Sequence, residues 1–212
     1  MTDSKRPSSD VAFSPSVKAV QARRGSREAF ARMETERGGW RTDIIPDMRA
    51  FLAEVRSFYL ATASADGQPY VQHRGGPPGF LRVVDEHTLA FADFKGNRQY
   101  ITTGNLAENA RAMMFIMDYA QRRRLKIWGR ARIVEDDDAL LAQLWPEGYK
   151  ARPEQVIVFE VEAWDTNCAQ HIPQLFAAED VARTIVQFQA RIRELEEEVA
   201  ALKVARGDAG GT

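Results

Sequence analysis

Within residues 70–135, short apolar runs alternate with basic, glycine-containing turns, and seven of the cationic side chains there are candidates for one ligand site. The whole chain carries 29 Lys+Arg against 30 Asp+Glu, so a basic site there is a local feature. Cations at strand ends in an otherwise neutral protein predict a site for an anion, and we expect a phosphate. Phosphate recognition in turn favours a nucleotide-type cofactor. The seven side chains are Arg74, Lys95, Arg98, Arg122, Arg123, Arg124 and Lys126.

The turn at residues 94–99 (FKGNRQ) is the first candidate for this site. It follows an apolar run and turns through Gly96, so its backbone N–H groups and the side chains of Lys95, Asn97 and Arg98 could converge on one anion. A guanidinium can bind phosphate through two hydrogen bonds, and an ammonium adds a point charge. The alternative interpretation is a solvated hairpin turn.

The run at residues 122–130 (RRRLKIWGR) is the second candidate. As a strand it places Arg124, Lys126, Trp128 and Arg130 on one face and apolar residues on the other. Cations and an indole on one face are costly to bury unless an anionic or aromatic group pairs with them. The alternative is an exposed basic strand face.

Two histidines are candidates for proton transfer. His73 precedes a small-residue loop at 75–79 (GGPPG), where a flat ligand or a second stretch of backbone could approach closely. His171 follows the single cysteine, Cys168, but a Cys–His nucleophilic pair within one loop has little support. Either histidine could instead be structural. One cysteine and three histidines predict no metal site, and the sequence contains no Gly-rich Rossmann or Walker loop.

The spacing of apolar residues predicts the elements that position these side chains. Many short strands in hairpin-like succession, with few helices between them, indicate a mainly β fold, an antiparallel barrel with peripheral helices. Helices are expected within 14–33, from Pro46, at 105–111 and at 136–144. The expected strands are 57–64, 69–74, 80–84, 88–93, 112–119, 125–135 and 155–163.

Composition divides the chain into three parts. Residues 1–45 are expected to form a flexible start with short helices, 46–173 the barrel domain, and 174–212 a C-terminal helix with a frayed tail. A heptad pattern in the last part favours a parallel two-stranded coiled coil, and packing of the helix on its own barrel is the alternative. The heptad residues are Ile185, Phe188, Ile192, Leu195, Val199 and Leu202.

Bulk properties exclude several classes of protein. The balanced charge argues against nucleic acid or an anionic membrane as a partner. A single cysteine excludes an internal disulfide and fits a reducing compartment. The first 20 residues contain no apolar signal-peptide core, and no apolar run reaches membrane-spanning length. We therefore expect a cytoplasmic protein.

In order and spacing, these motifs resemble the FMN-binding split barrels of the pyridoxamine 5′-phosphate oxidase-like family. The matching positions are 69–74, 97–99 (NRQ), 109–115 (NARAMMF) and 123–129. The segments 72–80 (QHRGGPPGF) and 164–173 (WDTNCAQHIP) are similar to an uncharacterised bacterial subgroup rather than to the oxidase proper. Ala92 and Asp93 stand where the oxidase has Tyr-Thr, Gln99 replaces a lysine, and the substrate-binding arginine segment has no counterpart.

The resemblance implies a homodimer with FMN at the subunit interface. Lys95, Asn97 and Arg98 would hold the phosphate of the cofactor. Arg124, Lys126 and Trp128 would contact the cofactor from either chain. Gln72, His73 and Arg74 would lie near its isoalloxazine ring and ribityl chain. The complete implied cofactor-binding set is Gln72, His73, Arg74, Lys95, Asn97, Arg98, Gln99, Arg124, Lys126 and Trp128.

The leading functional hypothesis is an FMN-dependent oxidoreductase acting on an unknown small molecule, with a pyridine nucleotide or small organic donor reducing the flavin. His73 and His171 are the candidate catalytic residues. The alternative is a carrier or sensor that binds flavin, haem or deazaflavin without efficient turnover, and the same histidines are the candidate haem ligands. A third hypothesis is a dimeric scaffold built around the C-terminal coil.

Overall fold

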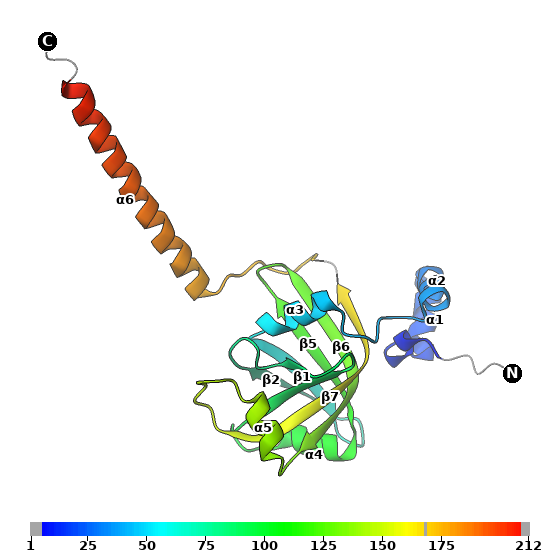
Figure 1. Cartoon of the computed structure of the whole chain (residues 1–212). Coiled ribbons are helices and arrows are strands. Elements are labelled where there is room, and N and C mark those ends of the chain that lie inside the picture. Colours follow the sequence, from blue (N-terminus) through cyan, green and yellow to red (C-terminus); the bar gives the residue numbers. More distant parts are fainter. Residues whose placement is uncertain (1–5, 168, 209–212) are drawn as a thin grey trace. The chain divides into compact units, whose positions relative to one another are not determined.

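The computed structural model describes residues 6–167 and 169–208, which form two compact units. The first unit contains the described residues up to Asp118 together with Arg122–His171. The second contains Tyr119–Gln121 and the described residues from Ile172 onward. The first unit holds the whole sheet, and the second contains one long helix (Figure 1).

Seven strands of the described chain form one sheet, in the order β2-β1-β5-β6-β7-β4-β3. Every pairing is antiparallel, and β2 and β3 are the two edges, so the barrel is split rather than closed. The prediction of a mainly β, antiparallel split barrel is therefore confirmed. The strands are β1 (Ser57–Ala63), β2 (Pro69–Gly75), β3 (Arg82–Val83), β4 (Thr88–Phe94), β5 (Arg111–Asp118), β6 (Arg123–Val134) and β7 (Pro153–Asn167).

Helices of the first unit begin and end at local signals. The Ser14 side chain accepts a hydrogen bond from the Val17 N–H at the start of α1, and Asp137 does the same for Leu140 in α5. Gly25 ends α1 in the left-handed conformation. The helices are η1 (Ser8–Val11), α1 (Pro15–Arg24), α2 (Arg27–Arg37), α3 (Pro46–Glu54), α4 (Ile101–Glu108) and α5 (Asp138–Leu144).

The main core lies between the inner faces of the strands and α3. Alternation sends Phe58 and Leu60 inward from β1 while Tyr59 between them is exposed. Leu52 of α3 is fully buried in the same cluster. This alternation fixes which side chains of each strand can contact a ligand outside the barrel.

Three predicted elements differ from the observed ones. The strand expected at 80–84 is shorter and contains only Arg82–Val83. Phe80 and Leu81 are buried, but they belong to the loop that precedes the strand. The helix expected at 105–111 begins at Ile101 and ends at Glu108, and residue 111 already belongs to β5. Strand β7 continues to Asn167 instead of ending at 163, since it pairs with β6 beyond a bulge at Trp128 and Gly129.

The described part of the N-terminal segment is held together by hydrogen bonds and contacts the barrel through Trp40. The Ser8 N–H donates to the Gly38 carbonyl at 2.8 Å. Ser9 is fully buried, and its hydroxyl donates to Glu34 at 3.2 Å. Trp40, which follows α2, stacks on Trp128 of β6 at 4.7 Å between ring centroids.

The second unit is dominated by α6 (Ala178–Asp208), a continuous helix of 31 residues. The helix predicted near the C-terminus is therefore present. The frayed tail expected at its end lies largely outside the described residues, as does Cys168. Within the described residues, no helix combines the length and apolar character needed to cross a membrane.

Candidate functional site

Polar side chains gather where four strands of the barrel meet α4, which lies at one end of the barrel in Figure 1. Five of these side chains are buried in an otherwise apolar interior. Buried polar groups are costly unless they are hydrogen-bonded, so their partners position the surrounding elements. We call this set the polar layer: Thr62, Gln72, Arg74, Asp93, Thr102, Thr103, Asn105 and Gln155.

Two hydrogen bonds of the polar layer hold α4 against the first two strands. The Thr102 hydroxyl donates to Gln72 Oε1 at 2.7 Å. Asn105 Nδ2 donates to Thr62 Oγ1 at 3.0 Å. Gln72 therefore positions the first turn of α4, in addition to any contact it makes with a ligand.

Arg74 and Asp93 form an ion pair between β2 and β4, strands that are not hydrogen-bonded to each other. Their side chains are 12% and 11% exposed. Gln155 of β7 donates to the second oxygen of Asp93 at 2.9 Å and to the Thr103 hydroxyl at 3.0 Å. The pair thus bridges the open side of the split barrel, and the Arg74 charge is compensated inside the protein.

The loop from Lys95 to Tyr100, here called the anion loop, leads from β4 into α4 and is exposed. Asn97 shapes it, since its Oδ1 accepts from the Gln99 N–H at 3.2 Å and its Nδ2 donates to Gln99 Oε1 at 3.3 Å. Arg98 and Tyr100 both adopt positive φ, at 61° and 53°. Helix α4 has no side-chain cap at its start, so its first N–H groups remain available to an anion.

Two cations of the anion loop are available to a ligand. Lys95 and Arg98 form no ion pair with a carboxylate in the part of the chain that the structure describes. Arg98 Nε donates to the Tyr100 hydroxyl at 3.3 Å, which in turn donates to Glu154 at 3.5 Å. The hydrogen bond to Tyr100, with Glu154 nearby, raises the pKa of Arg98, which therefore stays charged.

Two cations of the basic strand at 122–130 have carboxylate partners within the chain. Arg123 pairs with Asp118 at 3.0 Å, and Lys126 pairs with Asp165 of the neighbouring strand at 2.8 Å. The predicted alternation of its faces is observed. However, cations that already have carboxylate partners are weak candidates for binding a second anion.

Trp128, in the middle of β6, has an aromatic partner in the same chain. Its ring lies nearly parallel to that of Trp40, at 12°. Lys126 Nζ lies 5.2 Å from the Trp128 centroid and 5.7 Å from the Trp40 centroid. One face of the Trp128 ring, an expected flavin contact, is therefore covered by Trp40 of the N-terminal segment. Arg124 Nε is buried without a hydrogen-bond partner among the described residues.

Strand alternation separates the three expected ligand contacts of β2. Gln72 and Arg74 are partly buried and bind the polar layer, whereas His73 lies on the outer face and is exposed. There its ring meets Tyr59 edge-on, with centroids 5.7 Å apart. His171, the other candidate, is exposed and has φ of 62°. The structure therefore places His73 on a different face of β2 from Gln72 and Arg74.

The small-residue loop after β2 serves packing. A Cβ on Gly76 would lie 2.6 Å from the Phe80 ring, and Phe80 is only 2% exposed. A Cβ on Gly75 would lie 3.2 Å from His73 Cε1 and 3.3 Å from the Arg56 carbonyl. The close approach predicted at these glycines is thus made by the protein's own side chains and backbone.

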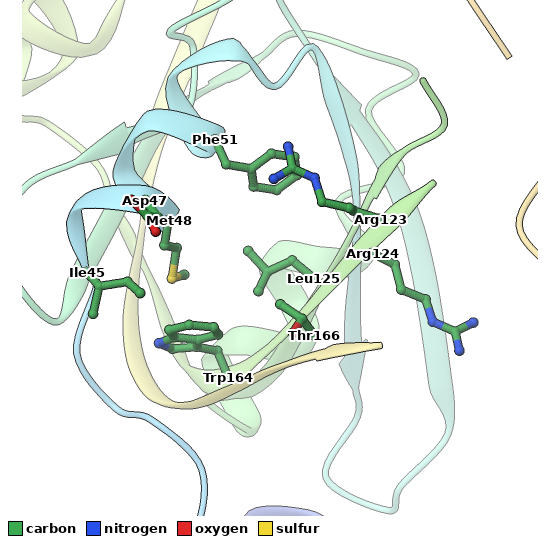
Figure 2. A pocket seen from close by; sticks show the side chains of 9 residues that line it. All are labelled: Ile45, Asp47, Met48, Phe51, Arg123, Arg124, Leu125, Trp164 and Thr166. Atoms are coloured by element: carbon green, nitrogen blue, oxygen red, sulfur yellow. The ribbon is translucent and has the colours of Figure 1, made fainter. Parts of the chain in front are cut away.

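A small apolar cavity of about 130 Å³ lies between α3 and strands β6 and β7 (Figure 2). Arg123 lies over the Phe51 ring at its edge, while Arg124 points away (Figure 2). Pockets for cofactors usually measure about 300–1,000 Å³, so this cavity is too small for a flavin ring. Neither Lys95 nor Arg98 lines it.

Sequence reasoning missed the partners that organise the site. In the sequence, Asp93 is visible only as a departure from the family pattern and not as the partner of Arg74. A carboxylate inside an apolar run requires a buried partner, and this signal could have identified the pair. Tyr100 and Glu154, which flank Arg98, had no comparable signal because they are 54 positions apart.

The chain is similar to one sequence family and to several solved structures. The sequence model of the pyridoxamine 5′-phosphate oxidase family matches residues 44–168, more than half of the chain. HupZ of Group A Streptococcus is 20% identical, with a TM-score of 0.48, over 62% of this chain and 99% of that one. A putative pyridoxamine 5′-phosphate oxidase of Lactobacillus delbrueckii is 20% identical, with a TM-score of 0.46, over 59% and 95%. No curated protein sequence matches significantly.

Proposed function

We propose that this chain, which belongs to the pyridoxamine 5′-phosphate oxidase family, binds FMN with the phosphate at the anion loop. The cofactor lies between two copies of the barrel, and the protein is an FMN-dependent oxidoreductase acting on a small molecule. The observation that supports this most is the pair of exposed cations, Lys95 and Arg98, at the uncapped start of α4. Among the other candidate cations, Arg74, Arg123 and Lys126 have carboxylate partners.

The residues of the anion loop fit a phosphate. Arg98 supplies a planar guanidinium, Lys95 a point charge, and the first N–H groups of α4 supply neutral donors. Gly96 has open space around its Cα, with no atom within 4 Å of an added Cβ, so the backbone does not obstruct an anion. Asn97 holds the loop in shape through its two hydrogen bonds to Gln99.

A second copy of the chain completes the site in this proposal. The anion loop is exposed, so the flavin ring needs a further wall. The outer face of β1 and β2 carries exposed apolar side chains, with Tyr59 42% and Val71 59% exposed. Burial of these side chains against a partner is favourable. His73 lies on the same face, beside Tyr59.

When bound, FMN supplies reversible transfer of electrons to or from the substrate. In this chain Lys95 and Arg98 neutralise the phosphate, and Gln72 keeps the first turn of α4 in position through Thr102. A paired barrel excludes water from the ring. His73 is the candidate for holding a proton at the interface, because its exposed imidazole lies on the face that the second copy covers.

The absorption spectrum of the purified protein, with added FMN where needed, tests this function. We expect flavin absorption bands that stay with the protein through gel filtration, and their bleaching when a reduced pyridine nucleotide reduces the flavin. A Soret band would favour the haem-binding alternative instead. A colourless, folded protein that does not take up FMN would contradict the proposal.

A further inference from the structure

Helix α6 carries a continuous apolar seam that the chain leaves exposed. The seam residues occur three and four positions apart, and their side chains are 43% to 68% exposed. A soluble protein seldom exposes so long a row of large apolar side chains without a partner. We define the seam as Val181, Ile185, Phe188, Ile192, Leu195, Val199 and Leu202.

The seam has the width of a coiled-coil interface. A helix that packs on a globular core usually shows a broader apolar stripe, with three or more apolar residues per two turns. Here Val186 is the exposed large apolar residue that lies off the seam. The helix of 31 residues is about 46 Å long, which is longer than the three heptads that the seam spans.

We propose that a second copy of α6 covers this seam in a parallel, in-register two-stranded coiled coil. In the heptad, the a positions are Ile185, Ile192 and Val199, which are β-branched. The d positions are occupied by Val181, Phe188, Leu195 and Leu202. β-Branched residues at a combined with leucine at d favour two parallel strands over higher oligomers. Leucines fill the two C-terminal d positions.

Charge complementarity beside the seam supports a second copy as the occupant. In a parallel pair, each g position faces the e position five residues later in the partner. Arg191 at g then faces Glu196 at e, and Glu198 at g faces Lys203 at e. Both charged pairs are attractive in this register. The contact of Arg191 with Glu194 at 2.9 Å is within one helix and is exposed, so it competes weakly.

This coil is a dimer contact separate from the barrel interface proposed above, so its test needs a local readout. Full-length Leu195→Cys, in a Cys168→Ser background, is oxidised mildly and analysed on non-reducing gels. Position 195 lies on the seam, and Glu197→Cys, two residues away on the opposite face, is the matched control. We expect Leu195→Cys to form covalent dimers at least about 10-fold faster than Glu197→Cys.

Equal rates of cross-linking at the two positions, or no covalent dimer of Leu195→Cys on the gel, would overturn the proposal. The latter is the result expected if the helix packs on its own barrel or pairs antiparallel. Ile192→Cys at an a position provides a second seam site in case Leu195→Cys perturbs the helix. Because the readout is local, it is independent of FMN binding, and either proposal can fail without the other.

A charge exchange tests the register. In the Leu195→Cys background, Arg191→Glu places like charges opposite each other and should slow cross-linking several-fold. Adding Glu196→Arg restores attraction between the chains and should recover the rate. The Arg191–Glu194 contact is absent from both variants, so recovery reports the pair between chains. No recovery in the double exchange would refute the parallel register.

Discussion

Ion pairing inside the chain separates cations that hold the fold from cations that can bind a ligand. Arg74 is paired with Asp93 in a mostly buried position. Removing the partner of a buried charge is costly, so a phosphate could recruit Arg74 only by displacing Asp93. Lys95 and Arg98 carry no such cost, because both are exposed and face no carboxylate partner among the described residues. The two kinds of cation should respond differently to substitution.

We predict that Arg74→Ala lowers the free energy of unfolding by about 3–5 kcal/mol, because the buried Asp93 carboxylate loses its compensating charge. Urea denaturation followed by tryptophan fluorescence measures this loss. The matched control replaces both partners, Arg74→Met with Asp93→Leu, and should recover much of the stability. A single variant as stable as the parent protein would show that the pair does not hold the barrel together.

Arg98→Ala should weaken FMN binding and leave the stability of the fold unchanged. We expect FMN affinity to fall by about 10- to 100-fold, the usual effect of losing a charge-assisted hydrogen bond, while the urea midpoint stays unchanged. Fluorescence titration measures the affinity. Arg132→Ala, which removes another exposed cation from the barrel, is the control and should bind FMN normally. Unchanged affinity in Arg98→Ala would remove this residue from the site.

Elements with a clear apolar period were predictable from sequence, and elements held by tertiary polar contacts were not. Strand β6 alternates buried Leu125 and Ile127 with the less buried residues between them, so a period of two found it. The start of α4 was missed because Thr102, Thr103 and Gly104 are poor helix formers. Thr102 donates a hydrogen bond to Gln72 of β2, and Thr103 accepts one from Gln155 of β7. These bonds stabilise the helix there despite its low propensity.

The candidate site was predictable in its cations but not in their partners. The sequence shows Lys126 and Trp128 as a basic, aromatic face. Strand pairing brings Asp165 opposite Lys126, and the N-terminal segment brings Trp40 onto Trp128. Both partners are distant in sequence, so no local pattern could show that this face is already occupied.

Gly129 is required by the close approach of β6 and β7 at their bulge. A Cβ there would lie 2.0 Å from the Glu160 carbonyl oxygen, which belongs to the backbone and has little room to move. We predict that Gly129→Ala lowers stability by about 3 kcal/mol or more. Gly104→Ala, at an exposed helical position with no atom within 4 Å, should raise it by about 0.5–1 kcal/mol. Urea denaturation of both variants checks the contrast, and a tolerated Gly129→Ala would contradict it.

Trp40 attaches the N-terminal helices to the barrel through its stack on Trp128. We predict that Trp40→Ala releases this segment, because stacking contributes about 0.5–1.5 kcal/mol beyond the apolar area it buries. Trypsin should then cleave several-fold faster at the arginines of α1 and α2. Trp145→Ala, at an exposed tryptophan after α5, is the control. Equal cleavage rates in both variants would show that the stack does not hold the segment.

At the scale of the whole molecule, the two units suggest two separate roles. The barrel unit carries the family match and the anion loop, and the second unit carries the exposed seam of α6. We expect the barrel interface to bind the cofactor and the seam to join two chains. The heptad spacing was visible in the sequence, whereas the surface that covers it depends on a second chain and not on local propensity.

Titration of the cofactor-free protein with FMN and with riboflavin tests the central proposal most directly. Riboflavin has the same ring and ribityl chain but lacks the phosphate, so the comparison isolates the contribution of the anion loop. We predict that FMN binds at least about 10-fold more tightly than riboflavin, and that Lys95→Gln combined with Arg98→Ala removes most of this difference. Equal affinity for the two flavins, or no binding of FMN by the folded protein, would contradict the proposal.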